Sequence, residues 1–509
     1  MTYTYKSMFS LMVGSGRLSE AGFRSCLEQR SGRTSGMDTH ISRGSGSQAA
    51  ISSAGFAGAN PSEQTAGISE SSLKLSRELS VLDLIVYGMV YMLPIAPFAL
   101  YGIISNVSGG MVPLVYIVSV VAMMFTARSY QILSKEFPAA GSAYTYAQNG
   151  IGDLAGFLAG WLVFLDYIIA PGLLAVVSAV AMNSLVPEIP RSVWVIGFVG
   201  LGTILNLVGI SVTAKVNQAF LVIMLVILAA FVGVGLFALY SGMGHGRLTF
   251  GSLFNVHTFT WAGLGTGILI GSTNFLGFDA ITTLGEEVRS EKRHLASFAG
   301  MASLVIIAIL FVLQTWIAAD LASGAKVLSP DSAFYDISGY AGGHWLFAMT
   351  SISTALAFGV PCTIVCQMAI ARIIFAMGRD RQLPKVFSRL SRRSKQPYVA
   401  NIFVASISLI IALVFQDRLD DLALFQNFGA FSAFILVNLS VIGYFRIKKQ
   451  SKDTWNHVVL PAIGFLVIVA LMVAMRAATL KMGIIWLVIG LVYYFVMRHV
   501  FGRSAALKI

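Results

Sequence analysis

Residues 87–98 read Tyr87-Gly88-Met89-Val90-Tyr91-Met92-Leu93-Pro94-Ile95-Ala96-Pro97-Phe98, an apolar segment with two prolines in its second half. A second apolar segment is interrupted at Gly271-Ser272-Thr273-Asn274-Phe275-Leu276-Gly277-Phe278-Asp279. Inside a membrane each backbone polar group needs a hydrogen-bond partner, so such interruptions are tolerated only beside a cavity, a neighbouring helix or a ligand. Corresponding interruptions in the two halves of a polytopic protein indicate the substrate site of an inverted-repeat transporter.

The composition is that of an integral membrane protein. The 509 residues are 56% hydrophobic and 11% charged, which leaves too few polar groups to cover a water-exposed surface. Apolar stretches of roughly 20 residues, the length that crosses the hydrocarbon core as a helix, predict twelve spans. They occupy approximately 81–106, 112–133, 154–184, 192–210, 216–241, 262–285, 297–319, 344–378, 399–416, 423–445, 457–475 and 482–501. The runs are continuous rather than alternating, which excludes a membrane β-barrel.

The net charge of +12 reflects membrane orientation rather than a nucleic-acid partner. Lysines and arginines gather in alternate loops, which is the bias that marks cytoplasmic loops. One such loop carries Arg379, Arg381, Lys385, Arg389, Arg392, Arg393 and Lys395. With an even number of spans, this pattern places both termini in the cytoplasm.

The ends of the chain differ from the apolar middle. Residues 1–73 are rich in Ser and Gly and show no apolar periodicity, so we expect a disordered tail. A transporter domain is predicted at 74–502, followed by a short cytoplasmic tail at 503–509.

No residue pattern points to enzyme chemistry. Cys26 lies in the tail, and we expect Cys362 and Cys366, one turn apart in a span, to be small packing residues. The seven histidines lie in the tail, in loops or near span ends, which argues against a histidine proton relay. We therefore expect no catalytic residue, no bound metal and no cofactor.

The first interruption is expected to bind substrate through its backbone. Prolines lack an amide hydrogen and disfavour helix in the residues before them, so two half-helices should result. Amides around Ala99 and Leu100 would face an anion such as a carboxylate, and the carbonyls that end the first half would face a cation. A simple proline kink is the alternative. The candidate binding residues are Pro94, Ile95, Ala96, Pro97 and Phe98.

The second interruption brings polar and aromatic side chains to the middle of the membrane. Ser272, Thr273 and Asn274 are expected to hydrogen-bond a small polar substrate, while Phe275 and Phe278 cover it or attract an ammonium group. Hydrogen bonding of these polar side chains to nearby backbone is the alternative.

Charged residues inside spans are candidate functional residues by default. Asp166 lies in mid-span beside Tyr167, where it attracts a substrate ammonium or takes up a coupling proton. A structural bond to a neighbouring helix is the alternative. Asp279 is the second candidate coupling residue, near the cytoplasmic end of the sixth span. We expect Glu286 and Glu287 to pair with loop arginines.

Several of these residues resemble motifs of the amino acid, polyamine and organocation (APC) permeases. The similarity covers roughly residues 74–501. Its motifs are Pro138-Ala139-Ala140-Gly141-Ser142-Ala143-Tyr144-Thr145-Tyr146-Ala147, Gly277-Phe278-Asp279-Ala280 with Glu286-Glu287 and the basic run Arg289 to Arg293, and Arg372 with Met377-Gly378-Arg379-Asp380. Within the family, putrescine importer-like members are resembled through Leu165-Asp166-Tyr167, Asn427-Phe428-Gly429-Ala430 and Val437-Asn438-Leu439-Ser440-Val441.

The resemblance implies an all-α, LeuT-like fold with broken first and sixth helices. Two inverted five-helix repeats at about 81–241 and 262–445 would be followed by two trailing helices at about 457–501. Substrate would lie between the broken helices, with spans three, eight and ten closing the site. Tyr167 matches a third-helix tyrosine implicated in substrate recognition in the putrescine importer group.

Two residues depart from the family pattern. Ala99 stands where putrescine importers are expected to carry an acid, which leaves Asp166 as the well-placed buried carboxylate. This departure favours an amino acid, whereas the family match favours putrescine. Met224 stands where some proton-coupled members carry a lysine. The site of proton coupling is therefore left open.

The sequence thus predicts a secondary transporter of the bacterial inner membrane that imports an amino acid or polyamine, with protons and by alternating access. Its partners would be a small amino-group-bearing solute, protons and the lipid bilayer, with no nucleic acid. A putrescine-specific importer is one alternative. A non-transporting sensor or a channel on the same scaffold is an alternative of another class, and oligomeric state is left open.

Overall fold

The computed structural model describes residues 81–137, 142–208, 214–279, 281, 293–379, 384–391 and 396–500. The predicted tail at 1–73, Cys26, and the loop that carries Glu286 and Glu287 lie outside these residues. Every regular element in the described ranges is a helix, so the predicted all-α membrane fold is confirmed.

Most helices follow the predicted apolar stretches, and two short helices, Ser142–Gly150 and Ala333–Gly342, lie between them. In chain order they are α3 (Val81–Met92), α4 (Pro97–Ser108), α5 (Val112–Glu136), α6 (Ser142–Gly150), α7 (Asp153–Leu185), α8 (Arg191–Val208), α9 (Ala214–Tyr240), α10 (Trp261–Ser272), α12 (Arg293–Ala322), α13 (Ala333–Gly342), α14 (His344–Ala357), α15 (Thr363–Arg379), α16 (Tyr398–Phe415), α17 (Leu419–Val441), α18 (Leu460–Val473) and α19 (Ala477–Val500). The described chain also contains two short 3₁₀ turns, η2 (Thr273–Phe275) and η5 (Lys385–Ser388). Three further turns are π-helical, namely η4 (Phe358–Cys362), η6 (Ile442–Lys448) and η7 (Trp455–Val459).

Ten helices in the described ranges are long and apolar enough to cross a membrane. The bent pair of α3 and α4, with 53° between its halves, makes up to eleven. The sixth predicted stretch contains α10 and η2, and its continuation at 282–292 lies outside the described residues. The protein is therefore a multi-pass membrane protein, while the count of twelve spans and the inverted repeat remain predictions.

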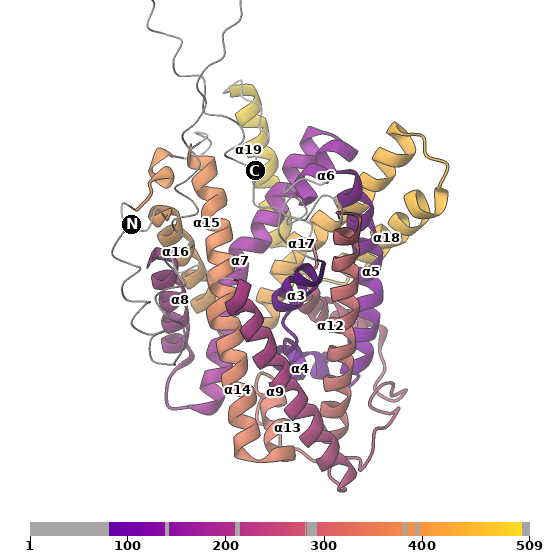
Figure 1. Cartoon of the computed structure of the whole chain (residues 1–509), viewed down its shortest axis with the longest axis vertical. Coiled ribbons are helices and arrows are strands. Elements are labelled where there is room, and N and C mark those ends of the chain that lie inside the picture. The colour runs from indigo at the N-terminus through magenta and orange to yellow at the C-terminus, as the bar shows by residue number, and fades with distance from the viewer. Residues whose placement is uncertain are drawn as a thin grey trace, which may run out of the picture. The chain divides into compact units, whose positions relative to one another are not determined.

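Two long helices organise the packing around the broken segments. α12 packs along α5 and α3, and α7 packs against α17, α8 and α14. Figure 1 shows α3 near the centre of the helices, next to α12. The two interrupted segments therefore lie within the packed helices.

The contact between α7 and α17 is unusually close at Gly429. A Cβ atom at this position would lie 2.8 Å from the carbonyl oxygen of Leu162 and 3.0 Å from the amide nitrogen of Asp166. Glycine therefore lets the two backbones approach, as small residues do where membrane helices pack tightly. This approach accompanies the hydrogen bond from Gln426 of α17 to Asp166 of α7.

Candidate functional site

Break one, residues 93–96, separates α3 from α4 by a compact turn. Leu93 has a φ of 51°, in the left-handed region, and Pro97 begins α4, where a missing amide hydrogen costs nothing. The carbonyl of Leu93 accepts from the amide of Ala96 at 2.8 Å, and that of Pro94 accepts from Nε2 of Gln314 on α12 at 2.9 Å. Several backbone polar groups of break one therefore have hydrogen-bond partners within the protein.

Two carbonyls at the end of α3 lose their usual helical donor. The i+4 residue of Val90 is Pro94, which has no amide hydrogen, and the i+4 residue of Met92 is Ala96, whose amide bonds Leu93 instead. Val90 and Met92 both line the cavity described below. Break one therefore offers acceptors, which suit a cation.

The amide end of break one is more fully engaged than the sequence predicts. Phe98 donates to the carbonyl of Ile95 at 3.0 Å, and Ala99 donates to that of Ala96 at 3.2 Å. The amide of Ala99, expected to face an anion, thus already has a partner in the turn.

Break two, residues 273–279, follows α10 and is held by side chains from two other helices. Nδ2 of Asn427 on α17 donates to the carbonyl of Leu269 at 2.6 Å and to Oγ1 of Thr273 at 2.8 Å. Nδ2 of Asn274 donates to the hydroxyl of Tyr116 on α5 at 2.7 Å. Beyond η2 the chain becomes extended at Leu276, so the helical phase of α10 is lost.

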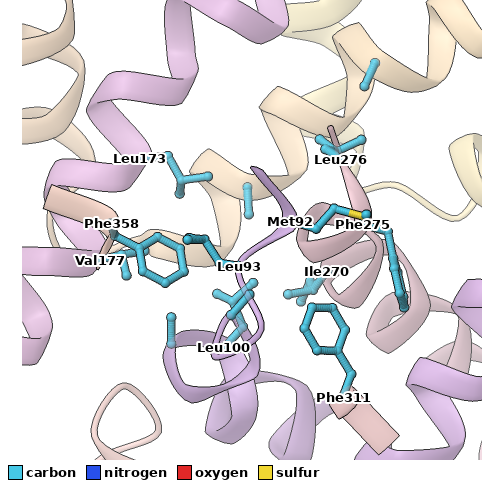
Figure 2. Packing of buried hydrophobic residues seen from close by; sticks show 14 of the residues in the cluster. Met92, Leu93, Leu100, Leu173, Val177, Ile270, Phe275, Leu276, Phe311 and Phe358 are labelled. Carbon is cyan, nitrogen blue, oxygen red and sulfur yellow. The ribbon is translucent and has the colours of Figure 1, made fainter. Parts of the chain in front are cut away.

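A cavity of about 110 Å³ lies between the two breaks and helices α7, η4–α15 and α17. Its volume is several times the roughly 10–15 Å³ that one water molecule needs. Figure 2 groups Leu93 with Leu173, Val177 and Phe358 on one side of break one, with Met92 and Phe275 on the other. The lining residues are Tyr87, Val90, Tyr91, Met92, Leu93, Ala96, Ala99, Leu100, Asp166, Tyr167, Ala170, Leu173, Leu174, Val177, Thr273, Asn274, Leu276, Gly277, Asp279, Phe358, Pro361, Cys362, Val365, Cys366 and Gln426.

The cavity brings together six of the residues that the sequence singled out for binding or coupling. They are Ala96, Asp166, Tyr167, Thr273, Asn274 and Asp279. The remaining candidates, Pro94, Ile95, Pro97, Phe98, Ser272, Phe275 and Phe278, are buried but do not belong to its lining.

The three phenylalanines pack into aromatic clusters instead. Phe98 stacks on Phe334 of α13 with ring centroids 4.0 Å apart. Phe275 lies 5.2 Å from Phe311, and Phe278 lies 5.4 Å from Phe434. These rings support the segments that surround the cavity.

Sequence reasoning missed several lining residues. Cys362 and Cys366, interpreted as packing residues, line the cavity together with Phe358, and Phe358 and Cys362 belong to the π-helical turn η4. Such turns are rare and are often found at functional sites. Pro361 within the span was the available signal. Gln426, a polar side chain in an apolar helix, was a second.

The cavity is acidic. Asp166 and Asp279 both line it, and no Lys, Arg or His is present among its described lining residues. Oδ1 of Asp166 accepts from Nε2 of Gln426 at 2.8 Å. A carboxylate away from water is costly unless it is hydrogen-bonded, paired with a cation or protonated. The arrangement therefore suits a positively charged ligand with N–H donors.

Comparison with known proteins supports a transporter. The family described as amino acid permease matches residues 89–461. The low-affinity putrescine importer PlaP of Escherichia coli (strain K12) is 32% identical over 437 residues, which are 83% of this chain and 94% of the relative. The branched-chain amino acid permease BcaP of Bacillus subtilis (strain 168) is 25% identical over 83% of this chain and 93% of the relative. The methylthioribose transporter of the same organism is 22% identical over 85% of this chain and 95% of the relative. The relatives named here are permeases and transporters rather than enzymes.

Proposed function

The chain belongs to the amino acid permease family, and from this premise we propose that it is a secondary transporter that imports a small amine by alternating access, coupled to protons. In this proposal the solute enters the cavity between the two breaks, and the protein sits in the inner membrane with both termini in the cytoplasm. The positive charge of the cytoplasmic loops supports that orientation.

The observation that carries the proposal is Asp166, a carboxylate on the cavity that accepts from Gln426 at 2.8 Å, with no basic residue among the described lining residues. A protonated amine supplies both the charge and the N–H donors that such a site needs. Tyr87, Tyr91 and Tyr167, which also line the cavity, add aromatic faces that attract ammonium groups.

A diamine fits this site better than an amino acid. Asp279 also lines the cavity, so the lining that contains Asp166 carries the second acid that position 99 lacks. The carboxylate of an amino acid finds fewer donors, because the amide of Ala99 is engaged at 3.2 Å. The similarity to a putrescine importer supports the same choice.

An amino acid is the second candidate, and Thr273 favours it. Oγ1 of Thr273 accepts from Asn427 at 2.8 Å, which leaves its hydroxyl hydrogen available to a carboxylate. The similarity to a branched-chain amino acid permease supports this candidate.

Asp166 and Asp279 are the proposed coupling residues. A carboxylate in a closed cavity carries a proton or meets a cation, whereas one opened to water ionises freely. Opening the cavity to water would then let a carboxylate release its proton, and closing it would require the carboxylate to bind a proton or the cationic substrate. Proton binding is thereby linked to the transport cycle.

Uptake by the full chain in proteoliposomes tests the function. We expect labelled putrescine to enter and to be displaced by unlabelled putrescine more strongly than by amino acids. Asp166→Asn and Tyr167→Ala should each abolish uptake while membrane insertion stays normal. Normal uptake by both variants would remove α7 from the site. Stronger displacement by free amino acids than by carboxylate-blocked ones would instead favour the amino acid.

Counterflow separates transport from the alternatives of another class. A carrier preloaded with unlabelled putrescine accumulates labelled putrescine transiently. A channel passes a current that does not saturate, and a sensor moves no substrate.

A further inference from the structure

Two neighbouring amides on α17 reach in different directions. Asn427 bonds break two through Leu269 and Thr273, whereas Gln426 bonds Asp166 on α7. No binding or coupling role is predicted from the sequence for either side chain. Asn427 is accounted for as a brace of break two, but Gln426 lines the cavity itself.

In the side-chain amide of Gln426 the nitrogen is hydrogen-bonded, whereas the oxygen has no partner among the described residues. Nε2 donates to Oδ1 of Asp166 at 2.8 Å. Oε1 is buried and makes no hydrogen bond within the described part of the chain, and the residue is only 7% exposed. Buried side-chain polar atoms almost always have a partner, so the unpartnered Oε1 of this lining residue is an acceptor that a ligand donor can satisfy.

The orientation of the amide follows from the chemistry of its neighbour. An ionised carboxylate only accepts hydrogen bonds, so Gln426 must present its NH₂ group to Asp166 and its oxygen elsewhere. The close approach of α17 to α7 at Gly429, one turn further along, holds the two side chains together. The amide is therefore fixed by both bonding and backbone packing.

We propose that Gln426 is a specificity-determining residue that selects protonated primary amines. Its Nε2 holds one oxygen of Asp166, and its Oε1, with the other Asp166 oxygen, accepts N–H groups of the ligand. A primary ammonium has three N–H donors, whereas a quaternary ammonium has none and leaves both acceptors unsatisfied. This inference rests on the proposed function and deepens it, because it assigns selectivity among amines to one residue.

Uptake kinetics in proteoliposomes test the role of Gln426. Gln426→Met keeps the length of the side chain and removes both its donor and its acceptor. We expect KM for putrescine to rise about tenfold to a hundredfold, the range for hydrogen bonds to charged groups, with a much smaller change in kcat. The preference for putrescine over N,N,N,N′,N′,N′-hexamethylputrescine, a competitor without N–H groups, should fall by a similar factor. A merely structural role would not move this discrimination.

Two further variants keep the test decisive. Gln367→Met changes a buried glutamine that does not line the cavity, and should leave KM and discrimination unchanged. In Gln426→Glu the two adjacent carboxyl groups share a proton, so the new side chain still donates to Asp166 and keeps an acceptor oxygen. This variant should preserve the preference for primary amines even if Gln426→Met is poorly folded. Loss of that preference in Gln426→Glu overturns the inference.

The outcome is separable from that of the proposed function. Loss of uptake in Asp166→Asn, together with unchanged KM and discrimination in Gln426→Met, overturns the role of Gln426 and leaves the proposed function in place. Normal uptake in Asp166→Asn with unchanged Gln426→Met kinetics overturns both.

Discussion

In break one, prolines at 94 and 97 remove two amide donors, and the remaining groups close a turn among themselves with one outside side chain, Gln314. Break two has no proline, and its open backbone is held by Asn427 on one side, while Tyr116 accepts from Asn274 on another. The first break is thus encoded largely in its own residues. The second depends on helices that are distant in the sequence, so the two should respond differently to changes in their surroundings.

Break two contacts the end of α3, just before break one, at Gly277 and Tyr91, and the largest expected effect lies there. Gly277 has a φ of +111°, and a Cβ atom would lie 1.9 Å from Cδ1 of Tyr91. Gly277→Ala therefore adds backbone strain and an overlap with the Tyr91 ring of α3, together about 3 kcal/mol or more of destabilisation. We expect uptake to be lost and the thermal transition in detergent to fall.

The control for this change is Gly242→Ala. Gly242 has a similar φ of +95° but nothing within 4 Å of an added Cβ atom, so it carries the strain without the overlap. Uptake should survive in this variant. Equal loss in both variants would mean that backbone strain, and not the contact between Gly277 and Tyr91, is responsible.

The next effect concerns the brace of break two. Asn427→Leu removes the donor to Leu269 and Thr273 and should lower stability by about 1–3 kcal/mol, since a buried carbonyl loses its partner. Uptake is expected to fall at least tenfold, because Thr273 lines the cavity. Initial uptake rates normalised to protein in the membrane measure this.

Asn401→Leu on α16 is the matched control. Asn401 is buried, and its side-chain atoms make no hydrogen bond within the described residues. Uptake in this variant should match the unmodified chain. If uptake in Asn427→Leu equals uptake in Asn401→Leu, break two does not depend on the hydrogen bonds from Asn427.

The same contrast explains which parts of the site the sequence predicts. The break at Pro94 is predictable because proline acts on its own backbone. Asp166 is predictable as a site residue because a charge is unusual in an apolar run. The phenylalanines at 275 and 278 were expected to face the substrate, but the 3₁₀ turn and extended Leu276 end the helical periodicity from which a side chain's direction is inferred. Gln426 stands out only as a polar side chain in an apolar helix, whereas its bond to Asp166 depends on α17 packing against α7 at Gly429, which the sequence does not predict.

The smallest expected effect is at the brace of break one. Gln314→Leu removes the donor to the carbonyl of Pro94, while the turn bonds of Leu93 and Ile95 remain. We therefore expect about 1 kcal/mol of destabilisation and a several-fold loss of uptake, clearly less than for Asn427→Leu. Thr315→Val is the control, because the hydroxyl of Thr315 bonds carbonyls of its own helix. A loss at Gln314 as large as that at Asn427 would show that break one also relies on its neighbours, because the prolines alone would not then hold the turn in place.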